Sequence, residues 1–136
     1  MPNLLEISDV AQNNPDKAII LAFNKGSSTT LNTFMANHAT MPSNIHFLYD
    51  SSGGRGTEIQ EIRKPLINYT GYAGGISDKN VKEIIEKIGA FEIDLPVWID
   101  MESGVRTNDY FDLKKVQSVL IDSEVYFKAR TIITQQ

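Results

Sequence analysis

Three short glycine-containing segments each follow an apolar run, and they are the segments best suited to chemistry. They cover residues 50–57, 73–78 and 100–105. Glycine allows backbone N–H groups to approach an anion closely, and it adopts positive φ angles at little cost. A helix that follows such a loop points its positive end toward the anion. Each loop alone could be a simple strand-to-helix turn, but three in succession favour a shared phosphate site.

Two aspartates and two arginines lie in or beside these loops. Asp50 and Asp100 each come directly after an apolar run. A partly desolvated carboxylate there can act as a general acid or base, or it can cap its own loop. Arg55 and Arg106 could hold an anion through paired hydrogen bonds, with solvated side chains as the alternative. The candidate ligand contacts are therefore Gly53, Gly54, Arg55 and Arg106.

The remaining chemistry-bearing residues are few. The chain has no cysteine and two histidines, His38 and His46, so it offers neither a thiol nucleophile nor a metal-ligand spacing. The Walker pattern Gly-x-x-x-x-Gly-Lys-Ser/Thr and the dinucleotide pattern Gly-x-Gly-x-x-Gly are both absent from the sequence. We therefore expect no metal ion and no cofactor.

Four apolar runs rich in β-branched or aromatic residues predict strands at residues 18–23, 45–49, 66–72 and 97–101. None alternates cleanly, which predicts burial on both faces, as in a parallel sheet. Helical spacing is clearest at residues 78–88, where Ser77 or Asp78 would be the N-cap, and at residues 112–121. Weaker helical patterns cover residues 4–12 and 29–39, and the tail after Asp122 is either one more turn or a frayed end.

This order of elements predicts an α/β fold with parallel βα units. Strands that alternate with helices pair in parallel through right-handed crossovers. An open doubly wound sheet and part of a (β/α)8 barrel both fit. A full barrel needs at least about 200 residues, so 136 residues leave room for about half of one. The chain is expected to be a single domain, 1–136.

The overall composition excludes several partners. A formal charge of −4 and a pI near 5.1 argue against nucleic-acid binding. No apolar stretch approaches a membrane span, and the first residues lack a basic signal region. A cytoplasmic location is expected.

The three loops together resemble the phosphoribosylanthranilate isomerase family, (β/α)8 enzymes of tryptophan synthesis that catalyse an Amadori rearrangement. The resemblance rests on FLYDSSGGRGT (residues 47–57), AGGISDKNV (73–81) and IDMESGVRTNDYFDLKKV (99–116). These match, in order, the ends of the family's sixth, seventh and eighth strands. The match covers about residues 18–121, and the four predicted strands would correspond to strands five to eight.

The resemblance implies roles for particular residues. Asp50 falls on the family's general acid, and Asp100 falls on a second aspartate near the anthranilate side of the substrate. The family holds its phosphate with backbone amides, which fall here on Gly74, Gly75, Ser103 and Gly104.

The chain also departs from the family pattern. The family's general base is a cysteine on its first strand, which this chain lacks. The segment Thr57-Glu58-Ile59 replaces the usual lysine and Phe-Asp-Trp. Glu102 stands where a small serine is usual, and its carboxylate should weaken phosphate binding unless it points away or Arg106 offsets its charge.

Three hypotheses follow. The chain is the C-terminal half of an isomerase, inactive alone because it has an acid without the base; or it is a non-catalytic module that binds a phosphorylated small molecule; or it is a half barrel that forms a homodimer. Half a barrel has two unpaired edge strands, which favours either self-association or a missing N-terminal half.

Overall fold

The computed structural model describes residues 3–23, 33, 36, 41–51, 62–65, 70–93 and 95–135. The side chains of Leu4 and of residues 125–135 lie outside this description. Most of the helix predicted at residues 29–39 and the first part of the strand predicted at residues 66–72 also fall outside it.

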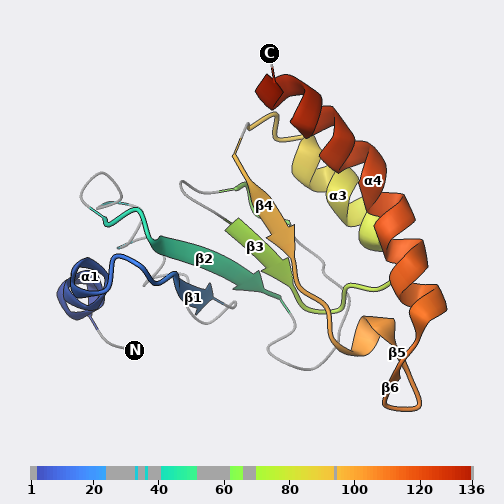
Figure 1. The fold of residues 1–136 in the computed structure, drawn as a ribbon, viewed down its shortest axis with the longest axis horizontal. Helices are drawn as coiled ribbons and strands as arrows, with labels where there is room; N and C mark the ends of the chain where they lie inside the picture. The colour runs from blue at the N-terminus through green and yellow to red at the C-terminus, as the bar shows by residue number, and fades with distance from the viewer. Residues whose placement is uncertain are drawn as a thin grey trace.

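Four parallel strands form the main sheet (Figure 1). They are β1 (Ile19–Phe23), β2 (Ile45–Asp50), β3 (Thr70–Ala73) and β4 (Val97–Ile99). Their order in the sheet equals their order in the chain, and each neighbouring pair is parallel. The predicted α/β fold with parallel βα units is therefore confirmed, and the sheet is consistent with half of a (β/α)8 barrel.

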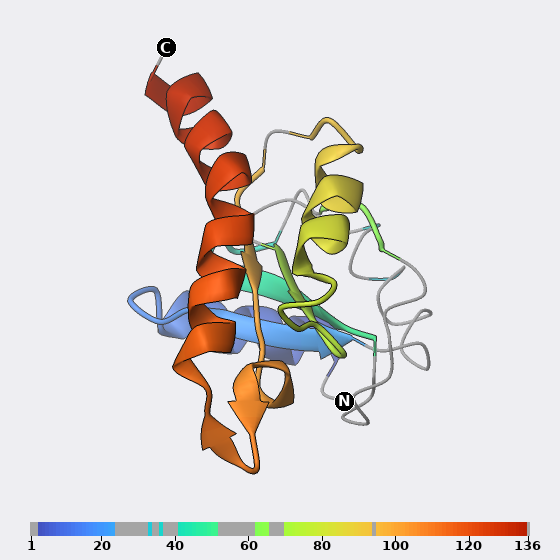
Figure 2. The ribbon, with the colours of Figure 1, turned by 90° about the vertical axis from the view of Figure 1, so that its right-hand side faces the viewer.

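Among the described residues, the sheet is accompanied by the helices α1 (Leu4–Asn13), α3 (Val81–Gly89) and α4 (Leu113–Gln135). The start predicted for α3 is wrong, because residues 78–80 form a turn and Asn80 is the N-cap. The tail after Asp122 does not fray after one turn; it continues α4, which extends well beyond the sheet (Figure 2). No described helix combines the length and apolar character of a membrane span.

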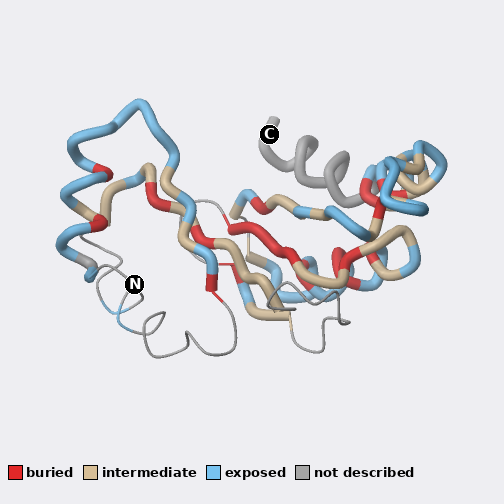
Figure 3. Tube along the Cα trace, turned by 90° about the horizontal axis from the view of Figure 1, so that it is seen from below, coloured by how far each residue is buried: buried red, intermediate tan, exposed pale blue. Residues whose placement is uncertain are grey.

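The outer face of the sheet carries the core. The period of two along each strand sends alternate residues to this face, where Phe47 and Tyr72 are almost fully buried. One cluster joins α1 to β1 and β2 through Ile7 and Ala11. The other packs α3 and α4 on β3 and β4, with Val81, Ile84, Ile85 and Ile88 of α3 all buried. Buried residues consequently follow the strands and the helix sides that face them (Figure 3).

The polar end of α1 is tied to the sheet by one asparagine. The Asn44 side-chain amide lies 3.0 Å from the carbonyl oxygen of Ala11, 3.1 Å from that of Asn14 and 2.9 Å from that of Lys17. The Asn44 carbonyl accepts a bond of 2.8 Å from the Ile19 N–H. Two of these acceptors, Ala11 and Asn14, belong to the last turn and the C-cap of α1, where carbonyl groups lack intrahelical partners. Together the bonds connect α1, the start of β1 and the start of β2.

The inner face of the sheet is open at β1, which corrects the prediction of strands buried on both faces. The register aligns Ala22, Leu48, Gly71 and Trp98 in one row across all four strands. Burial along β1 alternates, with Ile20 54% exposed, whereas all four residues of β3 are buried. The apolar runs were too short to distinguish these two cases, because half-buried and fully buried strands can both consist of apolar residues.

Gly71 lies beside Trp98 in this inner-face row, and the space there admits no side chain. A Cβ atom placed on Gly71 would collide with the Trp98 indole. Gly71→Ala should destabilise the protein by about 1–3 kcal/mol, the usual cost of overpacking. In contrast, Gly89→Ala at the end of α3 should be neutral or stabilise it by up to about 1 kcal/mol. Urea unfolding of both variants measures the difference, and equal stabilities would contradict the packing described.

Candidate functional site

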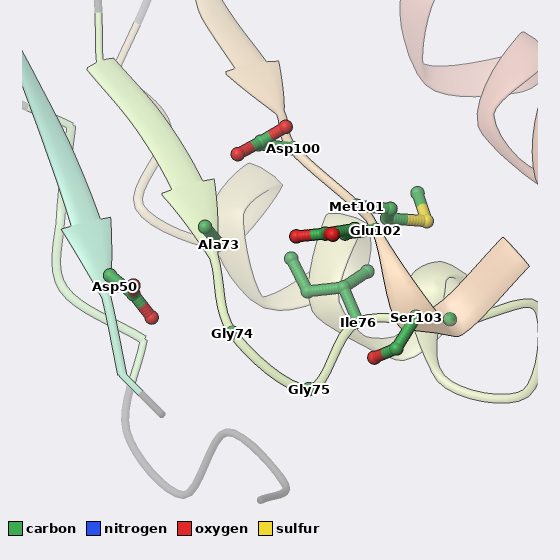
Figure 4. A pocket seen from close by; sticks show the side chains of 10 residues that line it. Asp50, Ala73, Gly74, Gly75, Ile76, Asp100, Met101, Glu102 and Ser103 are labelled. Carbon is green, nitrogen blue, oxygen red and sulfur yellow. The ribbon is translucent and has the colours of Figure 1, made fainter. Parts of the chain in front are cut away.

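A cavity of about 140 Å³ lies at the carboxyl ends of β2, β3 and β4 (Figure 4). Its lining comes from Asp50, from the loop after β3 and from the loop after β4; the residues are Asp50, Ala73, Gly74, Gly75, Ile76, Asp100, Met101, Glu102, Ser103 and Gly104. A protein cavity of about 150 Å³ can hold a benzene molecule, so this cavity has room for a phosphate group. Parallel α/β sheets place their sites at this edge.

The loop after β3 has a backbone that glycine makes possible. Gly74 has φ of 95° and Gly75 has φ of 67°, a region that L-residues with a side chain rarely occupy. The Asn80 side chain holds this loop through two hydrogen bonds. Its Nδ2 donates to the Gly75 carbonyl at 2.7 Å, and its Oδ1 accepts from the Ser77 N–H at 2.8 Å. Because Asn80 is also the N-cap of α3, its side chain links the conformation of this loop to the start of the helix.

The loop after β4 leads into the short 3-10 helix η3 (Ser103–Val105). Gly104 packs so closely against the Ile76 carbonyl that an added Cβ would overlap the carbonyl oxygen. The two glycine loops are therefore in direct backbone contact. Any larger residue at position 104 would push them apart, because the obstacle is backbone and not a flexible side chain.

The amide groups on the cavity wall are available to a ligand. Within the described part of the chain, the N–H groups of Gly74, Gly75, Ser103 and Gly104 donate no hydrogen bond. Because these four residues line one small cavity, their amides could together bind an anion with several oxygens.

Three carboxylates border the same cavity. Asp50 ends β2, and Asp100 directly follows β4, with its N–H bonded to the Tyr72 carbonyl at 2.9 Å. Ser51 connects the first carboxylate to the glycine loop, because its N–H donates to the Ala73 carbonyl at 3.2 Å. Asp100 and Glu102 point their carboxylates in the same direction, toward β3 and its loop (Figure 4).

Arg106 lies beside the cavity, outside its lining. Its Nη1 is 3.4 Å from Glu102 Oε1, and its guanidinium lies 5.6 Å from the centre of the Phe111 ring. It begins β5 (Arg106–Thr107), which pairs with β6 (Tyr110–Phe111) in a hairpin. The sequence analysis did not anticipate this hairpin. Asn108 and Asp109 at its turn both adopt positive φ, as the tight turn of a two-residue hairpin loop requires.

Asp112 joins the hairpin to α4. Its carboxylate accepts bonds from the Thr107 hydroxyl at 2.7 Å and from the Lys114 N–H at 3.0 Å. The Thr107 bond, supported by the backbone N–H groups and the charge of Lys115, lowers the pKa of Asp112 below its ordinary value. Lys115 Nζ in turn donates to the Arg106 carbonyl at 2.8 Å. These bonds hold the Arg106 backbone in position next to η3.

The predicted site residues fall into three groups. The structure brings together Asp50, Asp100, Gly74, Gly75, Ser103 and Gly104 at one cavity. Arg106 does not line the cavity but pairs with Glu102, which does, and Gly53, Gly54 and Arg55 lie outside the described residues. The sequence analysis did not assign roles to Ile76, Met101 or Asn80. For Asn80, the signal was its fixed place in the motif AGGISDKNV.

No metal centre accompanies the cavity in the described part of the chain, where no three His, Asp or Glu side chains are arranged to hold an ion. His46 lies within β2 on the inner face, and burial lowers the pKa of its imidazole. We assign it no role at the cavity, whose lining does not include it.

Comparison with known proteins identifies the class. The family model for N-(5'-phosphoribosyl)anthranilate (PRA) isomerase matches residues 6–122 of the chain. The chain therefore belongs to the PRA isomerase family, whose chemistry is a step of tryptophan biosynthesis. No curated protein sequence and no solved structure matches the chain significantly.

The Asn80 side chain provides the bonds that hold the loop after β3. Asn80→Ala removes two hydrogen bonds and should destabilise the protein by about 1–3 kcal/mol. Asn14→Ala is a matched control, since it removes one exposed bond, of 2.8 Å to the Val10 carbonyl, and should cost less than about 1 kcal/mol. Urea denaturation measures both. Equal losses would contradict the role assigned to Asn80.

Proposed function

We propose that this chain carries the phosphate-binding and general-acid end of a PRA isomerase. One observation carries the proposal: Gly74, Gly75, Ser103 and Gly104, whose N–H groups donate no hydrogen bond within the described residues, line the cavity that Asp50 and Asp100 border. The amides would bind the phosphate of a phosphorylated sugar. Membership of the family supports this assignment.

Asp50 is proposed as the general acid and Asp100 as the second aspartate of the site. Asp50 ends β2, and Asp100 follows β4. Both lie next to the end of β3, because Asp50 pairs with Ala73 and the Asp100 N–H bonds to the Tyr72 carbonyl. A phosphate anchored on the two glycine loops would place the sugar next to these carboxylates. Fixing a substrate beside an acid in this way converts proton transfer into an intramolecular step.

This chain, taken alone, is proposed to be inactive as an isomerase. An Amadori rearrangement needs one proton delivered and one removed. The resemblance to the family assigns removal to a cysteine, and the chain contains none. The proposed inactivity therefore rests on the missing cysteine. Among the described residues, the cavity lining contains no histidine or lysine, and its remaining carboxylates, Asp100 and Glu102, are not assigned the role of base.

A second candidate is a phosphate-binding half barrel that completes its sheet with another chain. β1 and β4 are the edges of the four-stranded sheet, and Ile20 of β1 is 54% exposed. Exposed parallel edges favour pairing with further strands. The partner would be either a second copy of this chain or an N-terminal half with the first four strands.

The phosphate site is tested by two substitutions at Gly75, which has φ of 67°. Asparagine and aspartate tolerate this conformation about equally, at a cost of about 1–2 kcal/mol in stability, but only aspartate adds a negative charge. Gly75→Asp should therefore bind inorganic phosphate and ribose 5-phosphate at least about tenfold more weakly than Gly75→Asn. Isothermal titration calorimetry measures the affinities, and circular dichroism checks that both variants fold. Equal affinities would place the anion site elsewhere.

The proposal that the chain needs a second half is tested by measuring its native mass together with its isomerase turnover. Light scattering should give either twice 15.2 kDa, as expected for a self-paired half barrel, or an aggregating species with unpaired edges. In neither case should PRA be isomerised faster than without protein. Turnover by a monomer of this chain would overturn the proposal that it needs a second half.

A further inference from the structure

The loop after β4 is bound by the start of α4. The hairpin β5–β6 lies between the two and brings them together (Figure 1). The Asp112 N–H donates to the Val105 carbonyl at 2.9 Å, and Lys115 Nζ donates to the Arg106 carbonyl at 2.8 Å. The Thr107 hydroxyl donates to the Asp112 carboxylate at 2.7 Å. Residues 105–107 directly follow the part of the loop that lines the cavity, so these bonds act next to the cavity.

The groups on either side of this loop are themselves fixed. On one side Gly104 packs against the Ile76 carbonyl, which is backbone. On the other side α4 is anchored, because Val116 and Val119 pack in the core cluster that contains the buried face of α3. The loop after β4 therefore lies between two rigid neighbours, and its position depends on its bonds to both.

Lys115 makes the connection to α4 that a side chain can alter most. Its ammonium group bonds a backbone carbonyl at a partly buried position, and a charged donor makes such a bond stronger than a neutral donor would. The bond between Asp112 and Val105 is made by backbone groups, and the bond between Thr107 and Asp112 is exposed to water. Of these contacts, the Lys115 bond is consequently the one most open to a test by substitution.

We propose that Lys115 is a positioning residue of the phosphate site: by binding the Arg106 carbonyl, it holds the loop after β4 in place against the loop after β3. The inference rests on the proposed function, because it concerns a loop that would bind the phosphate. Lys115 does not line the cavity, so it acts through the backbone and not by contact with the ligand. Without its bond the loop gains freedom that ligand binding must then remove, which lowers affinity.

The test compares Lys115→Met, which removes the ammonium group and keeps an unbranched side chain, with Lys115→Arg, which keeps a charged donor. Lys114→Met is the matched control. It removes the same charge one residue away, and the exposed Lys114 side chain makes no hydrogen bond or ion pair among the described residues. Calorimetry measures the affinities of the whole chain and its variants for inorganic phosphate and ribose 5-phosphate, and circular dichroism checks that the variants fold.

A second measurement reports on the loop without a ligand. The Asp112 N–H exchanges with solvent only when its bond to the Val105 carbonyl opens, so its exchange rate, followed by NMR, shows how firmly the loop is attached to α4. Lys115→Met should raise this rate about three- to tenfold, the effect of losing one hydrogen bond. Lys114→Met should leave it unaltered.

Lys115→Met should also bind both ligands about three- to tenfold more weakly than Lys114→Met. Lys115→Arg should bind nearly as tightly as the unsubstituted chain, because the guanidinium can donate to the same carbonyl. Equal affinities of Lys115→Met and Lys114→Met, or weaker binding without faster exchange, would overturn the positioning role and leave the phosphate site standing. If the unsubstituted chain binds neither ligand, the phosphate site is overturned, and the role of Lys115 in it is overturned as well.

Discussion

The parallel register of β2, β3 and β4 is the constraint on which the site depends. Pairing of Asp50 with Ala73 and of Tyr72 with Ile99 brings the carboxyl ends of three strands to one level. Because side chains alternate between faces, the same register sends Asp50, Ala73 and Asp100 to the inner face and leaves Tyr72 and Ile99 in the core. A slip of one residue would exchange the two sets and bury the carboxylates.

The glycine loops add precision to what the register provides. Gly104 packs against the Ile76 carbonyl, and the Asn80 side chain binds the Gly75 carbonyl and the Ser77 N–H. Backbone contacts of this kind are rigid, because neither partner can rotate away as a side chain can. In the proposed phosphate site, amide donors held in this way would need little reorganisation on binding, which is the usual advantage of a preorganised site.

The charge of its side chains is the feature in which this site differs most from the family pattern. The family resemblance led us to expect a small residue at position 102, and the chain has a glutamate there. The structure shows that Glu102 lines the cavity while Arg106 pairs with it from the hairpin side. The amides of the proposed site come from the backbone and the charges from side chains, so a substitution of Glu102 changes the charge at the cavity and leaves the two glycine loops in place.

The sequence by itself determined the α/β class, the order of the four parallel strands relative to α1, α3 and α4, and the six residues that meet at the cavity. Those features depend on local signals: short β-branched runs, helical spacing, and loops whose glycines and aspartates match a family pattern. Only the tertiary structure decided the later start of α3, the open inner face at β1, the hairpin after η3 and the clamp formed by Asn80. Each of these depends on which groups approach one another across the sheet and its loops, and residue type along the chain does not specify such contacts. The side on which Arg106 meets Glu102 was decided in the same way, because a hairpin turn and a bond from Lys115 fix its position.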